Sequence, residues 1–165
     1  MALRRVDPTA RRGAVYRTWV RLTNTPMANW ISRHIGWKVD PWLMRLTRGR
    51  LGVGLLLPSA LLETRGARTG AIRRHAVLYF HDGDRPTIVA SHMGLPSHPA
   101  WFHNLVANPD VVLGGEAFTA SVVTDAGEWE RLWTLAVQLF PPFTDYRRTA
   151  AAAGREIPLV QLEAR

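Results

Sequence analysis

The chain of 165 residues contains no cysteine. This absence excludes disulfides, thiolate nucleophiles and cysteine-based metal sites, and it gives no sign of an oxidising compartment. Long hydrophobic runs are also missing, because the longest one, from Leu51 to Leu62, is broken by Gly52, Gly54 and Pro58. That run is shorter than the roughly 20 residues that cross a bilayer, and the first residues hold no apolar core of signal-peptide length. We therefore expect a cytoplasmic protein without a transmembrane helix.

Acidic residues are scarce in the first part of the chain. Residues 1–50 carry eleven Arg and Lys against two Asp, a net charge of +9, whereas the whole chain nets +8. The same segment holds four of the seven tryptophans. Indole beside Arg is typical of a helix at an anionic membrane surface, so one prediction is peripheral contact with the inner face of the cell membrane. The alternative is that these helices pack Trp on the rest of the protein and turn Arg to solvent. No nucleic-acid-reading fold follows, so we expect no nucleic-acid partner.

The hydrophobic periodicity changes near residue 50. Residues 1–50 predict a basic, Trp-rich helical extension, and residues 51–165 predict a strand-rich domain. The extension should hold three helices, over Gly13–Leu22 with Val15, Trp19 and Leu22 at helical spacing, from Thr25 to near Gly36, and over Pro41–Thr47. The domain should hold six strands, at Ala60–Thr64, Arg73–His81, Thr87–Ser91, Val111–Leu113, Ala117–Val123 and Leu159–Glu163. Their connections are too short for parallel crossovers, so we expect an antiparallel barrel.

Three helices are expected inside this domain. Ser97 or His98 should cap a helix whose first residue is Pro99 and which ends at Asn108. Asp125 should cap a second helix that runs to about Phe140. The pair Pro141-Pro142 ends it, and a third helix starts at Thr144-Asp145 and runs through Ala150–Ala153.

The loop between the first two expected strands has the composition of a phosphate site. Gly66 and Gly70 flank Ala67, Arg68 and Thr69, and further arginines lie close by in the sequence. Glycine allows the positive φ that turns amides toward an anion, and arginine offers planar bidentate donors to phosphate. The alternative is an ordinary hairpin with solvated arginines.

Residues 56–163 carry a set of ordered motifs. They include R-G-A-R-T-G-A-I-R from Arg65, V-L-Y-F-H-D-G-D from Val77, V-A-S-H-M-G-L-P-S-H-P-A-W-F-H-N-L-V-A-N-P from Val89, and R-E-I-P from Arg155. This pattern resembles the deazaflavin-dependent nitroreductase and quinone reductase family. The resemblance implies a flavin-reductase-like split β-barrel of the mainly β (α+β) class and the coenzyme F420, an 8-hydroxy-5-deazaflavin. It also implies hydride transfer to an electron-poor acceptor such as a quinone, an enone or a nitroaromatic.

The resemblance also implies roles for individual residues. The cofactor-binding positions are Arg65, Arg68, Thr69, Gly70, Arg73, Ala76, Val77, Ser91, His92, Trp101 and Asn104. Tyr146 and Ser91 are the catalytic candidates on the substrate side. Phe102 and Leu105 are expected in the core, which is also the alternative for Trp101.

Two departures from the family pattern matter. Ala67 stands where the family favours Arg or Lys, and Arg65 offers a charge from the other side of Gly66. In the late aromatic motif Phe140 and Phe143 have lost the family's hydroxyls, so the proton donor there is Tyr146 or solvent. This puts activation of bicyclic nitro compounds in doubt.

Other chemistries fit the residues less well. His98 and His103 are five residues apart, which on a helix does not place two imidazoles on one face, so no metal site is expected. A serine hydrolase is not expected either, because the sequence contains no G-x-S-x-G nucleophile elbow. Two alternatives to the reductase stay open: a non-catalytic flavin- or deazaflavin-binding barrel, and an FMN-dependent oxidase of the pyridoxamine-phosphate type. The resemblance implies a small-molecule hydride acceptor as partner, and the sequence leaves the oligomeric state open.

Overall fold

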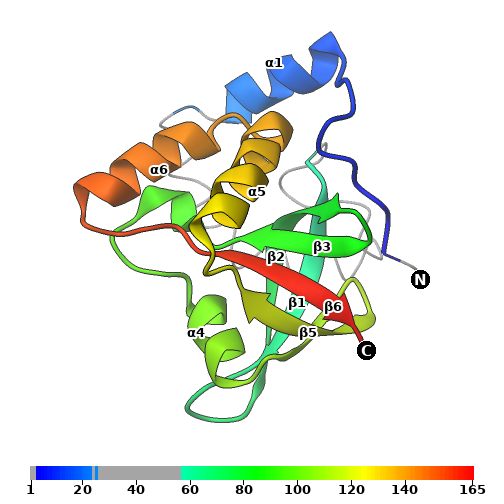
Figure 1. Cartoon of the computed structure of the whole chain (residues 1–165), viewed down its shortest axis with the longest axis vertical. Helices are drawn as coiled ribbons and strands as arrows, with labels where there is room; N and C mark the ends of the chain where they lie inside the picture. The colour runs from blue at the N-terminus through cyan, green and yellow to red at the C-terminus, as the bar shows by residue number, and fades with distance from the viewer. Residues whose placement is uncertain (1–2, 24, 26–56) are drawn as a thin grey trace.

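Six strands form a closed antiparallel barrel in the order β1-β2-β3-β6-β5-β4 (Figure 1). The structure is a computed structural model that describes residues 3–23, 25 and 57–165. The strands are β1 (Ser59–Arg65), β2 (Ile72–Asp82), β3 (Arg85–Val89), β4 (Asp110–Leu113), β5 (Glu116–Val122) and β6 (Leu159–Ala164). The predicted barrel is confirmed. The expected helices from Thr25 and over Pro41–Thr47 lie outside the described residues.

Strand β1 alternates buried and more exposed side chains. In β1 every second residue, Ala60, Leu62 and Thr64, is buried, so one face of the strand points into the core. The Gly66–Gly70 connection pairs β1 with β2 as a hairpin, with Leu62 opposite His75. The core is filled by fully buried side chains from several strands, among them Leu62, Phe80, Ile88, Leu113 and Leu162.

The described helices are α1 (Ala14–Thr23), the short 3₁₀ helix η2 (His92–Gly94), α4 (Ala100–Ala107), α5 (Ala126–Leu139) and α6 (Phe143–Ala152). Helices α4 and α5 pack against the barrel, and α1 lies on the far side of α5 and α6 from the strands (Figure 1). The Asp125 carboxylate caps α5 by accepting the Glu128 amide at 2.8 Å, as the sequence predicts. A stripe on α5 that includes Trp129 and Trp133 is buried against the barrel, and the Trp129 indole donates to the Ile157 carbonyl at 3.0 Å. None of the described helices is long and apolar enough to cross a membrane.

Two local predictions are wrong. The third strand runs over Arg85–Val89, so Ser91 follows the strand and does not end it. Helix α4 begins at Ala100, and Pro99 itself occupies the N-cap position without a side-chain cap. The predicted first helix is confirmed within one residue at each end, and on it Val15 is 74% and Leu22 60% exposed.

Helix α1 packs instead through the residues between those positions. Val20 is buried, and the half-buried Tyr16 donates its hydroxyl to the Leu139 carbonyl at 2.7 Å. Spacing alone did not choose this face, since Tyr16 and Val20 also lie four residues apart.

Residues 3–6 lie against the barrel. The His81 amide donates to the Val6 carbonyl at 2.8 Å, and the Tyr79 hydroxyl donates to the Arg4 carbonyl at 2.7 Å. Val6 is buried in the core. The start of the chain therefore contributes to barrel packing, although the division into 1–50 and 51–165 stays a prediction.

Candidate functional site

The arginine-bearing loop between β1 and β2 is held by its two glycines. The Gly66 amide donates to the Ala71 carbonyl and the Gly70 amide to the Gly66 carbonyl, both at 2.8 Å. Gly70 has a φ of 67°, which favours glycine, and a Cβ at Gly66 would lie 3.1 Å from Thr69 Oγ1. Because both ends of the loop are fixed, Arg68 and Thr69 are displayed at an exposed tip.

Two of the predicted anion-binding arginines are available to a ligand. Arg68 and Arg73 are exposed, and within the described part of the chain neither side chain makes a hydrogen bond or an ion pair. Their neighbour Arg74 is different, because it forms an ion pair with Glu63 at 3.0 Å. The charge of Arg73 and, more strongly, burial lower the pKa of His75. The hairpin thus separates a structural arginine from two free ones.

Asn104 attaches helix α4 to this loop. Its Oδ1 accepts the Ala67 amide at 3.1 Å, and its Nδ2 donates to Thr64 Oγ1 at 3.1 Å. Thr64 is 1% exposed, so the second bond lies in the core. Asn108 adds a longer bond of 3.4 Å to the Arg65 carbonyl. The Asn104 side chain therefore positions the loop, which is a more specific role than the sequence suggested.

Two of the predicted coenzyme-binding residues, Trp101 and Val77, are buried in the core. Trp101 is 7% exposed and belongs to the hydrophobic core. Val77 is also buried, whereas Ala76 is half-buried on the other face of β2. Leu105 is buried and Phe102 packs against the core, as expected.

A left-handed turn follows β3. His92, Met93 and Gly94 have φ values of 46°, 52° and 73°. Left-handed backbone is costly for the two residues that carry a side chain. A Cβ at Gly94 would lie 2.8 Å from the Tyr146 carbonyl, so only glycine allows this approach to α6. The turn thereby brings the segment after Ser91 against the helix that carries Tyr146.

The aromatic cluster lies at the start of α6. The ring centroid of Phe143 is 5.1 Å from that of Phe140 and 6.2 Å from that of Tyr146. Both phenylalanines are buried, whereas Tyr146 is half-buried. Tyr146, which carries the only hydroxyl of these three rings, is therefore also the most accessible of them.

Arg155 is a functional candidate that was not predicted from the sequence. It is 7% exposed and donates to the carbonyls of Ala90, at 3.2 Å, and Ser91, at 2.5 Å. Burial lowers its pKa. The R-E-I-P motif before the closing strand was the available signal, but a motif alone does not show that its arginine turns inward.

The expected separation of His98 and His103 is wrong. Their ring centroids are 5.9 Å apart, because His98 precedes α4 and helical spacing does not apply to it. Among the residues that the structure describes, no group of three or more His, Cys, Asp or Glu is arranged to hold a metal ion.

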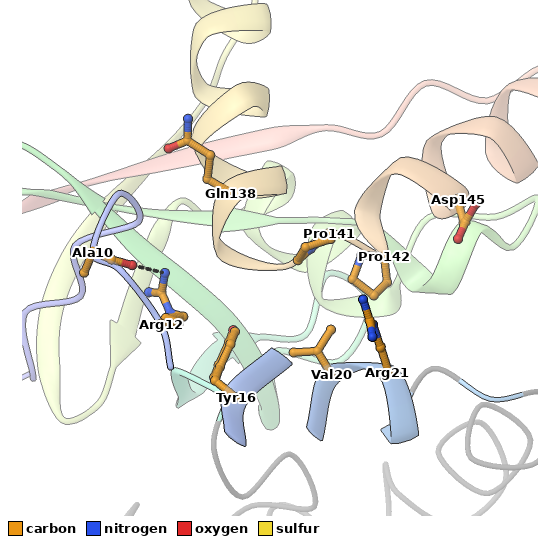
Figure 2. A pocket seen from close by; sticks show the side chains of 9 residues that line it. All are labelled: Ala10, Arg12, Tyr16, Val20, Arg21, Gln138, Pro141, Pro142 and Asp145. Atoms are coloured by element: carbon orange, nitrogen blue, oxygen red, sulfur yellow. Dashed lines mark hydrogen bonds between the residues drawn. The ribbon is translucent and has the colours of Figure 1, made fainter. Parts of the chain in front are cut away.

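A cavity of about 600 Å³ lies elsewhere, between α1 and the α5–α6 turn (Figure 2). Figure 2 shows Tyr16, Val20 and Arg21 pointing from α1 toward Pro141 and Pro142. The residues that line it include none of the predicted coenzyme-binding or catalytic positions. The cavity is therefore separate from the site assembled above, although Asp145 on its wall is the sequence neighbour of Tyr146.

Comparison with known proteins adds an independent finding. The family model described as F420H(2)-dependent quinone reductase matches residues 37–164. A protein of Mycobacterium tuberculosis named F420H(2)-dependent quinone reductase is 36% identical over 150 residues, which cover 84% of this chain and 99% of the relative. A Mycobacterium bovis protein, named as a putative enzyme of the same kind, matches equally well.

Two solved structures share the fold. One is an F420-H2 dependent reductase, with a TM-score of 0.55 and 32% identity, covering 64% of this chain and 94% of that one. The other, described as a domain-swapped dimer, has a TM-score of 0.58 and 30% identity, covering 76% of this chain and 96% of that one.

Proposed function

This chain belongs to the F420H(2)-dependent quinone reductase family, and on that premise we propose that it is an oxidoreductase that transfers a hydride from reduced coenzyme F420 to a quinone-type acceptor. The observation that carries the proposal is the family match over residues 37–164, which spans the whole described barrel. The barrel alone does not choose a reaction, because a fold hosts many functions.

The residues present fit an anionic, phosphate-bearing coenzyme. Arg68 and Arg73 offer two guanidinium groups without a partner among the described residues, beside a loop that Gly66 and Gly70 shape. Charged donors and loop amides together suit phosphate. Thr69 adds a hydroxyl at the same exposed tip. We assign phosphate binding to this set, with Arg65 as the replacement for the charge missing at residue 67.

Helix α4 connects the two halves of the proposed site. Asn104 holds the arginine loop, and the residues just before the helix adjoin the turn after Ser91. Eight helical residues span about 12 Å. For a ligand with a phosphate at one end and a ring system at the other, we place the phosphate at the arginine-bearing loop and the ring near Ala76, Ser91 and His92.

When bound, the reduced deazaflavin supplies two electrons as a hydride. The chain's part is to orient the reactants, exclude water and stabilise the charge that develops on the acceptor oxygen. Phe140 and Phe143 provide an apolar wall, and the half-buried Tyr146 phenol is the donor that we assign to the acceptor oxygen. Ser91 lies on the same side, since its turn packs against α6.

The test is a direct assay with two coenzymes. Purified protein is mixed with reduced F420 and menadione, and the deazaflavin absorbance is followed. Reoxidation that needs the protein supports the proposal. Binding without turnover would favour the non-catalytic barrel, and tight binding of FMN with oxygen consumption would favour the oxidase.

We also propose that α1 makes peripheral contact with anionic membrane. The support is the exposure of Val15 and Leu22 on a helix within the strongly basic residues 1–50. Apolar side chains on a basic helix combine an interfacial and an electrostatic attraction. A quinone acceptor dissolved in the bilayer is the substrate that this placement would serve.

A further inference from the structure

Arg155 is a buried cation that has no carboxylate partner among the described residues. It is 7% exposed, and no ion pair joins it to an acidic residue of the described chain. Its Nε atom is buried and has no hydrogen-bond partner. A buried charge without a counter-ion costs free energy, so its retention calls for a role that its contacts can reveal.

Its contacts lie on both sides of the left-handed turn: two main-chain carbonyls between β3 and the turn, and the side chain of His98 after it. The guanidinium donates to the carbonyls of Ala90 and Ser91, and Nη1 lies 3.2 Å from His98 Nδ1. A guanidinium has donors only, so the Nδ1 atom of His98 must be the acceptor. The His98 ring is therefore neutral in this arrangement, with its proton on Nε2.

The surroundings of His98 favour that neutral form. Burial, Arg155, His103 on α4 and His92 on η2 all lower its pKa, in that order. The remaining close neighbour is the Phe102 ring, with a centroid distance of 5.1 Å. No carboxylate is among the groups that act on His98. A proton on Nδ1 would place a second cation against Arg155.

The same segment is closed by a second contact. His92 Nδ1 lies 2.8 Å from the Ser97 carbonyl, so it donates a proton across the loop that runs from Ser91 to His98. This contact and the Arg155 bridge hold His92 and Met93 in their left-handed conformation. Backbone of this kind persists only where surrounding contacts impose it, and it is found mainly at functional sites.

We propose that Arg155 and His98 form a clamp that positions the Ser91–Gly94 turn for catalysis, and that protonation of His98 releases it. Both act as positioning residues: they touch main-chain carbonyls and each other. The catalytic consequence rests on the proposed function, because it assumes that this turn borders the ring of F420. The clamp itself is a property of the free protein.

The first experiment therefore uses the free protein. Long-range ¹H–¹⁵N NMR of the imidazoles should show His98 with its proton on Nε2 and a titration midpoint below that of an ordinary histidine. Arg155→Gln removes the opposing cation, so the midpoint should rise, and amide exchange over residues 91–98 should quicken. An unchanged midpoint, or a proton on Nδ1 in the wild type, overturns the clamp. If Arg155→Gln does not fold, the tautomer in the wild type and the exchange of Arg155→Lys decide the question.

The second experiment follows kcat/KM for reduced F420 and menadione against pH. The wild type should lose activity on the acid side. His98→Asn, whose Oδ1 mimics the accepting Nδ1 but does not titrate, should remove that acid limb, whereas the matched variant His103→Asn should keep it. A merely structural His98 would lower the rate at every pH and leave the profile unchanged in shape, which would refute the catalytic part. Absence of any turnover in the wild type would refute the proposed function. The clamp in the free protein would then be tested by the NMR experiment alone.

Discussion

Replacement of Asn104 by alanine tests how the Gly66–Gly70 loop is held. The change removes two neutral hydrogen bonds of 3.1 Å, one to the Ala67 amide and one from Asn104 to Thr64 Oγ1. Each such bond contributes about 0.5–1.5 kcal/mol, so the total is about 1–3 kcal/mol. The two losses should appear in different measurements. Thr64 is buried, so its bond supports folding, whereas the exposed Ala67 amide can turn to water when the loop is released.

We therefore expect Asn104→Ala to weaken F420 binding by roughly tenfold, because the loop must be ordered again on binding and 1.4 kcal/mol corresponds to a factor of ten. The melting temperature should fall by a few degrees, at about 2–4 °C per kcal/mol for a chain of this size. Titration calorimetry and thermal unfolding measure the two effects separately.

Thr64→Val is the matched control. It removes the buried hydrogen bond but leaves Asn104 free to hold the Ala67 amide, so it should lower the melting temperature with little change in the dissociation constant. Asn104→Ala with an unchanged dissociation constant would refute the positioning role. A loss of affinity by a factor of 1,000 or more would instead mean that Asn104 contacts the coenzyme directly.

Four further outcomes are expected. Arg73→Ala or Arg68→Ala should weaken F420 binding about tenfold or more, since a charged hydrogen bond contributes roughly 1.5–3 kcal/mol. The control Arg165→Ala should leave binding unchanged. Wild-type affinity in both the Arg68 and the Arg73 variant would remove the phosphate assignment. Tyr146→Phe should lower turnover with menadione and leave coenzyme affinity intact, and equal turnover would assign the proton to solvent. The full chain should sediment with anionic vesicles at low salt and dissociate as salt rises, more weakly in Val15→Glu/Leu22→Glu; indifference to vesicles would make α1 structural cover. Finally, burial lowers the pKa of three histidines, so the unfolded chain binds more protons below about pH 6.5 and the urea midpoint should fall between pH 7.5 and 5.5. These histidines are His75, His81 and His98.

The barrel could be predicted because its information is local. Strand periodicity, the glycine turns at Gly66–Gly70 and Gly114–Gly115, and the short connections all appear within a few residues of one another, and together they exclude parallel crossovers. The Asp125 cap was equally local and is confirmed. Consistent local choices of this kind are what specify a fold.

Contacts between distant segments were not predictable. Asn104 reaches Ala67 over 37 positions and Arg155 reaches Ser91 over 64, and no spacing rule connects such pairs. The assumption that His98 belonged to the helix also failed, because Pro99 takes the cap position and leaves His98 outside it. The family resemblance supplied candidate residues but not the manner in which each acts.

The exceptions to local rules gather at one place in this protein. His92 and Met93, the two described residues with a side chain and a left-handed backbone, come directly after Ala90 and Ser91, whose carbonyls Arg155 binds. Arg155 is a buried cation that forms no ion pair with any carboxylate of the described residues, and Gly94 allows a close approach to α6 that a residue with a Cβ would not permit. Strain and buried charge both cost stability, and each of them has to be offset by well-packed surroundings elsewhere. Their concentration after β3, beside Tyr146, therefore points to a function at this turn by a route that does not depend on the family match.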